Sequence, residues 1–173
     1  NIFFEKITTN HSSEKIILHA STFKSYAVRT WIYESAFEYI RGLNNLILSM
    51  KKLPNIKLII RIRPTNECSI STIKDNLLSS SNVIIKTGGN FYSDLRLSTL
   101  LISYSSTTIE EALYERIPVA LYGGSNRFRY YQNDELISSN IKKRKSIYNL
   151  SDENLTNNLN NIINNHYKKP LKD

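Results

Sequence analysis

The sequence predicts an α/β fold: a doubly wound parallel sheet of about six strands flanked by helices. Short apolar runs rich in Ile, Leu and Val alternate with helical patterns along the chain, and such runs are typical of strands buried on both faces. Repeated strand–helix–strand units form right-handed crossovers, which place helices on both faces of a parallel sheet. A chain of 173 residues is long enough to build one such domain.

Six short apolar segments are predicted strands, at residues 15–20, 56–62, 82–86, 99–104, 119–122 and 146–150. Between the first two, apolar residues recur at steps of three and four, which predicts a long amphipathic helix. They are Ile32, Ala36, Tyr39, Ile40, Leu43, Leu46, Ile47 and Met50. Further helices are predicted at 69–78, at 91–97 and from the turn after residue 104 to about residue 116. Ser151 is the predicted N-cap of the last helix, because Asp152 and Glu153 follow in its first turn.

Composition limits the classes of partner and site. The net charge of +8 fits nucleic acid, an anionic membrane surface or phosphorylated substrates. The one concentrated basic run, residues 142–145, is either a solvated loop or a contact for a membrane surface or lipid-linked acceptor. No apolar run approaches the roughly 18 residues of a membrane span. A single cysteine and three scattered histidines predict neither a disulfide framework nor a metal site. We expect a cytoplasmic setting, either free or peripheral to the inner membrane face.

A hydroxyl-rich turn follows the predicted strand at 99–104. Ser105, Ser106, Thr107 and Thr108 lead into the N-terminus of a helix, where free backbone N–H groups favour an anion such as a diphosphate. Glu110 and Glu111 follow one turn later, within reach of a sugar diol beside that anion. The alternative is a capping box, because Thr107 and Glu110, like Thr108 and Glu111, have its spacing.

The segment 99–124 resembles the C-terminal nucleotide-sugar-binding domain of GT-B-type glycosyltransferases, including makers of teichoic-acid-like polymers, and the related nucleotide-sugar 2-epimerases. The hydroxyl turn, Glu111 one turn into the helix and Pro118 seven residues later carry this resemblance. It implies a Rossmann-like domain over 15–167, a turn that binds the donor diphosphate and a ribose-binding Glu111. The sequence departs from the family in having Ser-Thr-Thr where glycines are common, and Arg116-Ile117 where Gly is frequent before the Pro.

Other candidate contacts also follow predicted strands, whose carboxyl ends form the ligand-binding edge of such sheets. Thr22 and Lys24 follow the first strand, where they belong either to the donor or acceptor site or to an ordinary polar loop. Arg61 and Arg63 alternate onto one face at the end of the second strand. Arg63 is the predicted diphosphate or nucleotide contact, and a salt bridge to a carboxylate is the alternative. His19, at the end of the first strand, is predicted to pack near the core rather than to act as a base.

Two glycine-containing loops complete the candidate set. Gly88 and Gly89 follow the third strand and resemble the loop that surrounds the base in the family, although a plain turn explains them too. Arg127 lies in a stretch of glycines, arginines and aromatics that suits a sugar or acceptor pocket. The same stretch suits a nucleic-acid surface, but no RNA-binding signature accompanies it, so no nucleic acid is predicted.

The resemblance implies that the chain is the donor-binding half of a glycosyltransferase in surface polysaccharide synthesis. A sugar would pass from a nucleotide-diphosphate sugar to an acceptor hydroxyl without cofactor or obligatory metal. Residues 1–14 are expected to be an extension or linker and 168–173 a frayed tail. We expect the catalytic base on a missing N-terminal Rossmann-like domain, which leaves this chain inactive alone. The alternatives are a nucleotide-sugar 2-epimerase, with acidic and histidine groups from both domains, and a non-enzymatic nucleotide-binding regulatory domain.

Overall fold

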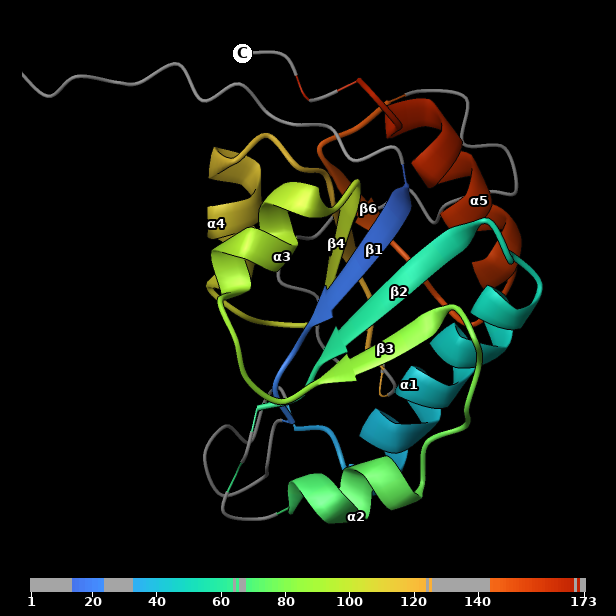
Figure 1. The fold of residues 1–173 in the computed structure, drawn as a ribbon, viewed down its shortest axis with the longest axis vertical. Helices are drawn as coiled ribbons and strands as arrows, with labels where there is room; N and C mark the ends of the chain where they lie inside the picture. Colours follow the sequence, from blue (N-terminus) through green and yellow to red (C-terminus); the bar gives the residue numbers. More distant parts are fainter. Residues whose placement is uncertain are drawn as a thin grey trace, which may run out of the picture.

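Six parallel strands form one sheet in the order β3-β2-β1-β4-β5-β6 (Figure 1). This arrangement comes from a computed structural model, which describes residues 14–23, 33–63, 65, 68–123, 125, 144–169 and 171. The order runs outward in both directions from the neighbours β1 and β4, as in doubly wound Rossmann-like sheets. The predicted fold class is therefore confirmed.

All six predicted strands are present, and their bounds lie within one residue of the prediction at each end. They are β1 (Lys15–Ala20), β2 (Ile56–Arg61), β3 (Val83–Lys86), β4 (Leu100–Ser103), β5 (Val119–Leu121) and β6 (Ile147–Asn149). The helices are α1 (Ala36–Lys51), α2 (Ile70–Asp75), α3 (Phe91–Leu97), α4 (Thr108–Tyr114) and α5 (Leu155–His166). The strands are recovered so well because their apolar runs have few polar interruptions.

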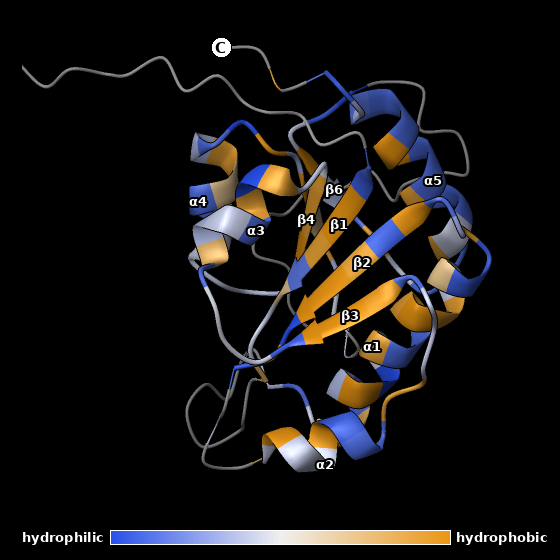
Figure 2. Cartoon of the chain, in the orientation of Figure 1, coloured by the Kyte–Doolittle hydropathy of each residue, from blue (hydrophilic) through white to orange (hydrophobic). Residues whose placement is uncertain are grey.

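The helices cover both faces of the sheet (Figure 1). Alternation along β1 directs Ile17 into the core shared with α1, α2 and α5, and directs Ile16 and Leu18 into the core shared with α3 and α4. The strands are apolar over most of their length, whereas the helices are polar on their outer sides (Figure 2). Burial of each large aliphatic side chain contributes about 1.5–3 kcal/mol, so both faces of the sheet hold the helices in place.

Helix α1 begins at a capping box that the sequence analysis did not identify. Ser35 Oγ accepts a hydrogen bond from the Glu38 backbone N–H (3.2 Å), and Glu38 Oε2 accepts one from the Ser35 backbone N–H (2.8 Å). Helix α2 ends three residues earlier than predicted. There Asn44 of α1 donates to the Asn76 carbonyl and accepts from the Leu78 N–H, which draws the chain out of the helix. The predicted Ile32 lies outside the described residues.

The prediction that Ser151 caps α5 is wrong. Helix α5 begins at Leu155, and Asn154 stands at the N-cap in the left-handed region (φ 56°) without a side-chain cap bond. Asp152 Oδ1 instead accepts hydrogen bonds from the Tyr122 hydroxyl (2.6 Å) and from Asn45 Nδ2 (3.0 Å). These bonds tie the segment before α5 to β5 and α1, so the helix starts a turn later.

Helix α4 ends in a Schellman motif, in which two backbone bonds satisfy its last carbonyls. The Arg116 N–H donates to the Leu113 carbonyl (3.0 Å), and the Ile117 N–H donates to the Ala112 carbonyl (2.8 Å). This geometry requires a left-handed residue, and Arg116 adopts φ 61°. The position is the one where glycine is frequent in the family that the sequence resembles, which gives that preference a physical reason.

Candidate functional site

A pocket of about 330 Å³ lies at the carboxyl edge of the sheet, where the strand order reverses between β1 and β4. Ligands of doubly wound sheets bind at such a switch point, and the volume falls in the usual range of ligand pockets. Its walls come from the segments that follow β1, β2, β3 and β4. The fold thus brings together loops that lie up to about 90 residues apart in the sequence.

The hydroxyl turn after β4 forms one wall of the pocket. Ser106, Thr107 and Thr108 line it. Ser105 was also predicted to contact a diphosphate, but it is only 3% exposed and does not line the pocket. In this tight turn the Ser105 side chain is directed into the protein interior, whereas those of the next three residues reach the pocket.

The same turn is tied to the end of β1. Thr108 Oγ1 donates to the Ala20 carbonyl (3.3 Å), and the buried Ser103 Oγ donates to the same oxygen (3.1 Å). Ser106 Oγ accepts a bond from the Thr108 backbone N–H (3.4 Å). These bonds fix the two loops at the switch point relative to each other, and Thr22 of the first loop lines the pocket.

Glu111 lines the pocket and is half-buried. Its carboxylate makes no hydrogen bond or ion pair with the described part of the chain. The capping-box alternative is wrong, because the N-cap residue Thr107 has helical backbone angles and its side chain makes no cap bond. Glu110 is exposed and lies outside the pocket. The carboxylate of Glu111 can therefore accept hydrogen bonds from a ligand in the pocket without breaking a bond to the described residues.

Two arginines at the end of β2 line the opposite wall. Arg63 is exposed and makes no ion pair within the described residues, so the salt-bridge alternative is not found there. Arg61, which the sequence analysis did not select, pairs with Asp94 and also donates to the Gly89 carbonyl (2.8 Å). Its position two residues before Arg63 on the same strand face was the signal that could have identified it.

The two predicted glycines do not line the pocket, although Thr87 of the same loop does. Gly88 and Gly89 are both exposed, and Gly89 has φ 86°, which favours glycine. Directly after this loop, Phe91 and Tyr92 do line the pocket, with their rings 5.7 Å apart in an edge-to-face arrangement. Such rings offer apolar surface to a base or sugar. The predicted contacts Lys24 and Arg127 lie outside the described residues.

His19 is buried on the other side of β1, as predicted. It is 3% exposed beside Tyr39, and burial lowers the pKa of its imidazole to about 4. Among the residues that the structure describes, no histidine lines the switch-point pocket. The pocket therefore combines hydroxyls, guanidinium groups and one carboxylate, which suit a polar anionic ligand.

Comparison with solved structures identifies the fold. UDP-GlcNAc 2-epimerase from Neisseria meningitidis, bound to UDP-GlcNAc, has a TM-score of 0.54 and 17% identity, over 92% of this chain and 40% of that one. The chain has the Rossmann-like fold of a GT-B domain. Two further structures resemble the chain at TM-scores below 0.5. A variant of the wall teichoic acid polymerase TagF has a TM-score of 0.49 and 19% identity, over 93% and 39% of the two chains. MnaA from S. aureus with UDP has 0.47 and 14%, over 70% and 31%.

The chain spans less than half the length of each of these structures. No known family matches its sequence, and no curated protein does either. At 17% identity the likeness extends to the fold and leaves the activity open. The roles of individual residues must therefore be argued from the pocket itself.

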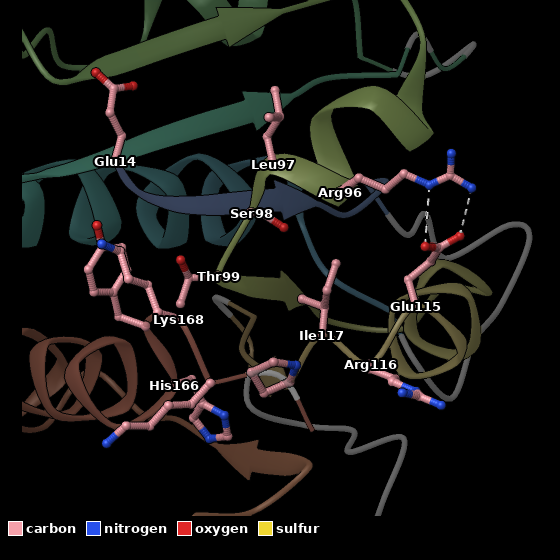
Figure 3. A pocket seen from close by; sticks show the side chains of 13 residues that line it. Glu14, Arg96, Leu97, Ser98, Thr99, Glu115, Arg116, Ile117, His166 and Lys168 are labelled. Carbon is pink, nitrogen blue, oxygen red and sulfur yellow. Dashed lines mark hydrogen bonds and ion pairs between the residues drawn. The ribbon is translucent and has the colours of Figure 1, made fainter. Parts of the chain in front are cut away.

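A second hollow, of about 50 Å³, lies at the opposite edge of the sheet (Figure 3). Glu14 and Thr99, which line it, precede β1 and β4, and the Arg96–Glu115 ion pair (3.1 Å) lies beside it. Because ligands of doubly wound sheets bind beyond the carboxyl ends of the strands, this hollow is the weaker candidate. Within the described residues, no cluster of three His, Cys, Asp or Glu could hold a metal ion.

The basic run at 142–145 is described only at its last two residues. Arg144 Nη2 donates to the Lys169 carbonyl and approaches His166 Nδ1 (3.5 Å), so it holds the end of α5. Within the described residues, no helix is long and apolar enough to cross a membrane. Arg144 thus has a structural role, and the predicted membrane contact remains a prediction.

Proposed function

We propose that this domain binds a nucleotide-diphosphate sugar at the switch-point pocket and acts as the donor-binding half of a glycosyltransferase. The observation that carries the proposal is the convergence of Thr22, Arg63, Ser106 and Glu111 on one pocket at the carboxyl edge of the sheet. Thr22, Arg63 and Ser106 come from three different loops and Glu111 comes from helix α4. The sequence analysis selected Arg63, Ser106 and Glu111 for the donor, and Thr22 as a donor or acceptor contact. If these were ordinary polar loops, their hydroxyl, guanidinium and carboxylate groups would not be expected to meet at one pocket.

The chemistry of the pocket suits the parts of such a donor. The hydroxyls of Ser106 and Thr107 can donate to phosphate oxygens, and the planar guanidinium of Arg63 matches two of them. The uncommitted carboxylate of Glu111 can accept hydrogen bonds from a ribose diol. When the bond between sugar and diphosphate breaks, negative charge grows on the diphosphate, and these donors stabilise it. We expect the base that activates the acceptor on a second domain of the enzyme.

UDP is the first nucleotide to test. The epimerase structure that shares the fold contains UDP-GlcNAc. The aromatic pair Phe91–Tyr92 offers a surface for a base at the side of the pocket that faces β3. The sequence contains nothing that selects uracil over cytosine or a purine, so CDP, GDP and ADP belong in the same panel.

A nucleotide-sugar 2-epimerase is the second candidate, since the structure with the TM-score of 0.54 is one. That reaction is expected to use acidic and histidine groups from both domains. His19 faces the interior at a pKa of about 4, and no histidine among the described residues lines the pocket. This supports the transferase as the first choice. Product analysis of the complete enzyme with UDP-GlcNAc distinguishes epimerisation from transfer.

The test is thermal stabilisation of the 173-residue chain by each nucleoside diphosphate and its sugar conjugates. At a ligand concentration of 100 times Kd, binding stabilises the native state by about 2.7 kcal/mol, which raises Tm by about 5–10 °C for a domain of this size. We expect a selective shift that is lost in Glu111→Ala and Ser106→Ala. Glu115→Ala, at the opposite edge of the sheet, should keep the shift. A shift that survives in Glu111→Ala would contradict the donor site and favour the nucleotide-binding regulatory alternative. No shift with any nucleotide would leave a likeness of fold alone.

A further inference from the structure

A buried carboxylate behind the pocket pairs with two basic side chains. Asp94, in the first turn of α3, is 5% exposed and accepts from Arg61 Nη1 and from Lys86 Nζ (2.5 Å). Arg61 and Lys86 are the last residues of β2 and β3, and they lie opposite each other in the sheet register. Arg61 Nη2 also donates to the Gly89 carbonyl (2.8 Å). One carboxylate therefore links two strand ends, a helix and a loop.

This network fixes the orientation of one pocket side chain. The guanidinium of Arg61 is planar, so two bonds in different directions, to Asp94 and to Gly89, set the direction of its remaining N–H groups. The Arg61 side chain is 16% exposed and lines the pocket, whereas Asp94 does not. A side chain that is already ordered loses less conformational freedom when a ligand binds. Asp94 can therefore affect the geometry of the pocket through Arg61 and the loop that Arg61 holds, rather than by contact with a ligand.

We infer that Asp94 is a positioning residue that presets Arg61 and the 87–90 loop for a bound diphosphate. The inference rests on the proposed function, since it assigns a second guanidinium to the same anionic ligand. The charge of the cluster also favours an anion. Arg61 and Lys86 share one carboxylate, so the cluster keeps a net positive charge beside the pocket.

The direction in which one substitution changes the affinity for an anion distinguishes a positioning role from a purely electrostatic one. Asp94→Asn removes a negative charge near an anion site, so a purely electrostatic role predicts tighter anion binding. A positioning role predicts weaker binding, because the neutral amide has one acceptor oxygen where the carboxylate has two, and it holds the Arg61 guanidinium less firmly. The expected loss is about tenfold in Kd, comparable to one charge-assisted hydrogen bond. Glu115→Gln makes the same change in net charge at the far edge of the sheet, where Glu115 pairs with Arg96.

The experiment is calorimetric titration of the folded 173-residue chain with UDP, CDP, GDP and ADP, and with inorganic pyrophosphate. The native chain, Asp94→Asn and Glu115→Gln are compared at a temperature where all are folded. Arg61→Ala and the double variant Arg61→Ala/Asp94→Asn complete a cycle. We expect Asp94→Asn to weaken binding about tenfold in the native background and to have no further effect once Arg61 is absent. If Asp94→Asn does not fold, Arg61→Lys replaces it, because it keeps the charge but loses the planar fork.

Each outcome decides the inference. The inference is overturned if Asp94→Asn binds as tightly as the native chain or more tightly, or if Glu115→Gln loses as much affinity as Asp94→Asn. Where Arg61→Lys is used instead, affinity equal to that of the native chain overturns it. Pyrophosphate binding without nucleotide binding overturns the proposed function, and the inference is then decided by the same variants with pyrophosphate as the probe. A native chain that binds neither overturns both.

Discussion

Gly123→Ala tests how tightly the end of β5 packs against the residue that precedes the hydroxyl turn. A Cβ at Gly123 would lie 2.2, 2.6 and 2.7 Å from three ring carbons of Tyr104. Ordinary contacts begin at about 3.4 Å, so the ring must retreat by about 1 Å in a close-packed interior. Tyr104 is 3% exposed, and its hydroxyl bonds to Ser125 Oγ (2.8 Å), which leaves it little room to move.

Overpacking of this kind costs about 1–3 kcal/mol, which lowers Tm by about 2–10 °C in a domain of this size. Urea unfolding followed by circular dichroism measures the loss. Tyr104 directly follows β4 and leads into the turn at residues 105–108, so the affinity for the nucleotide identified in the panel should also fall. Gly88→Ala is the matched control, because a Cβ there meets nothing within 4 Å, and its stability should stay within about 0.5 kcal/mol of the native chain.

A double-mutant cycle identifies the clash as the cause. In a Tyr104→Ala background, Gly123→Ala should cost much less than in the native background, because the ring that it meets is gone. An equal cost in both backgrounds, or a loss below about 0.5 kcal/mol in the native background, would refute the reasoning. It would show that the ring moves freely and that the end of β5 does not constrain the site.

Three further predictions concern stability. Arg116→Gly should stabilise the chain by about 1 kcal/mol in thermal unfolding, since Arg116 occupies φ 61° in the Schellman motif; a loss of stability would contradict this. Ser35→Ala should cost about 1 kcal/mol through loss of the capping box with Glu38, and an unchanged urea midpoint would oppose it. Burial lowers the pKa of His19 and His166 to about 4 from 6.5, with Arg144 contributing at His166. Between these values the unfolded chain binds protons that the native chain does not, so stability is full above pH 6.5 and falls on acidification toward pH 4, by up to about 1.4 kcal/mol per pH unit for each histidine. Urea unfolding at pH 7 and pH 5 measures this, and His19→Gln should reduce the difference.

Local patterns were sufficient for the strands and for the hydroxyl turn. The six apolar runs predicted all six strands, because a strand that is buried on both faces must be apolar along its length. Thr22, Arg63, Ser106 and Glu111 share one pocket because each follows the carboxyl end of a predicted strand, and the sheet brings those ends to one edge. For these residues, the order of elements along the chain already implied their proximity.

Local patterns failed to predict helix starts and caps where a polar side chain can bond either to a neighbour in the sequence or to a distant residue. Ser151 has the sequence features of an N-cap, but Asp152 bonds to Tyr122 and Asn45, which moved the start of α5 to Leu155. The spacing of the threonines and glutamates of the hydroxyl turn fits a capping box that the structure lacks. Both outcomes depend on backbone angles and on partners far away in the sequence.

The alternation of strands and helices, and the kinds of side chain at the switch point, could be predicted from the sequence alone. Which of those side chains bond to partners within the protein depends on the packed fold. Arg61 and Asp94 are 33 residues apart, and their pairing follows from the placement of α3 against the end of β2. Glu111 is left uncommitted although its spacing allows a local bond. Hydrophobic periodicity is a local property of the chain, whereas a hydrogen bond or ion pair depends on distances that exist only after the core has packed.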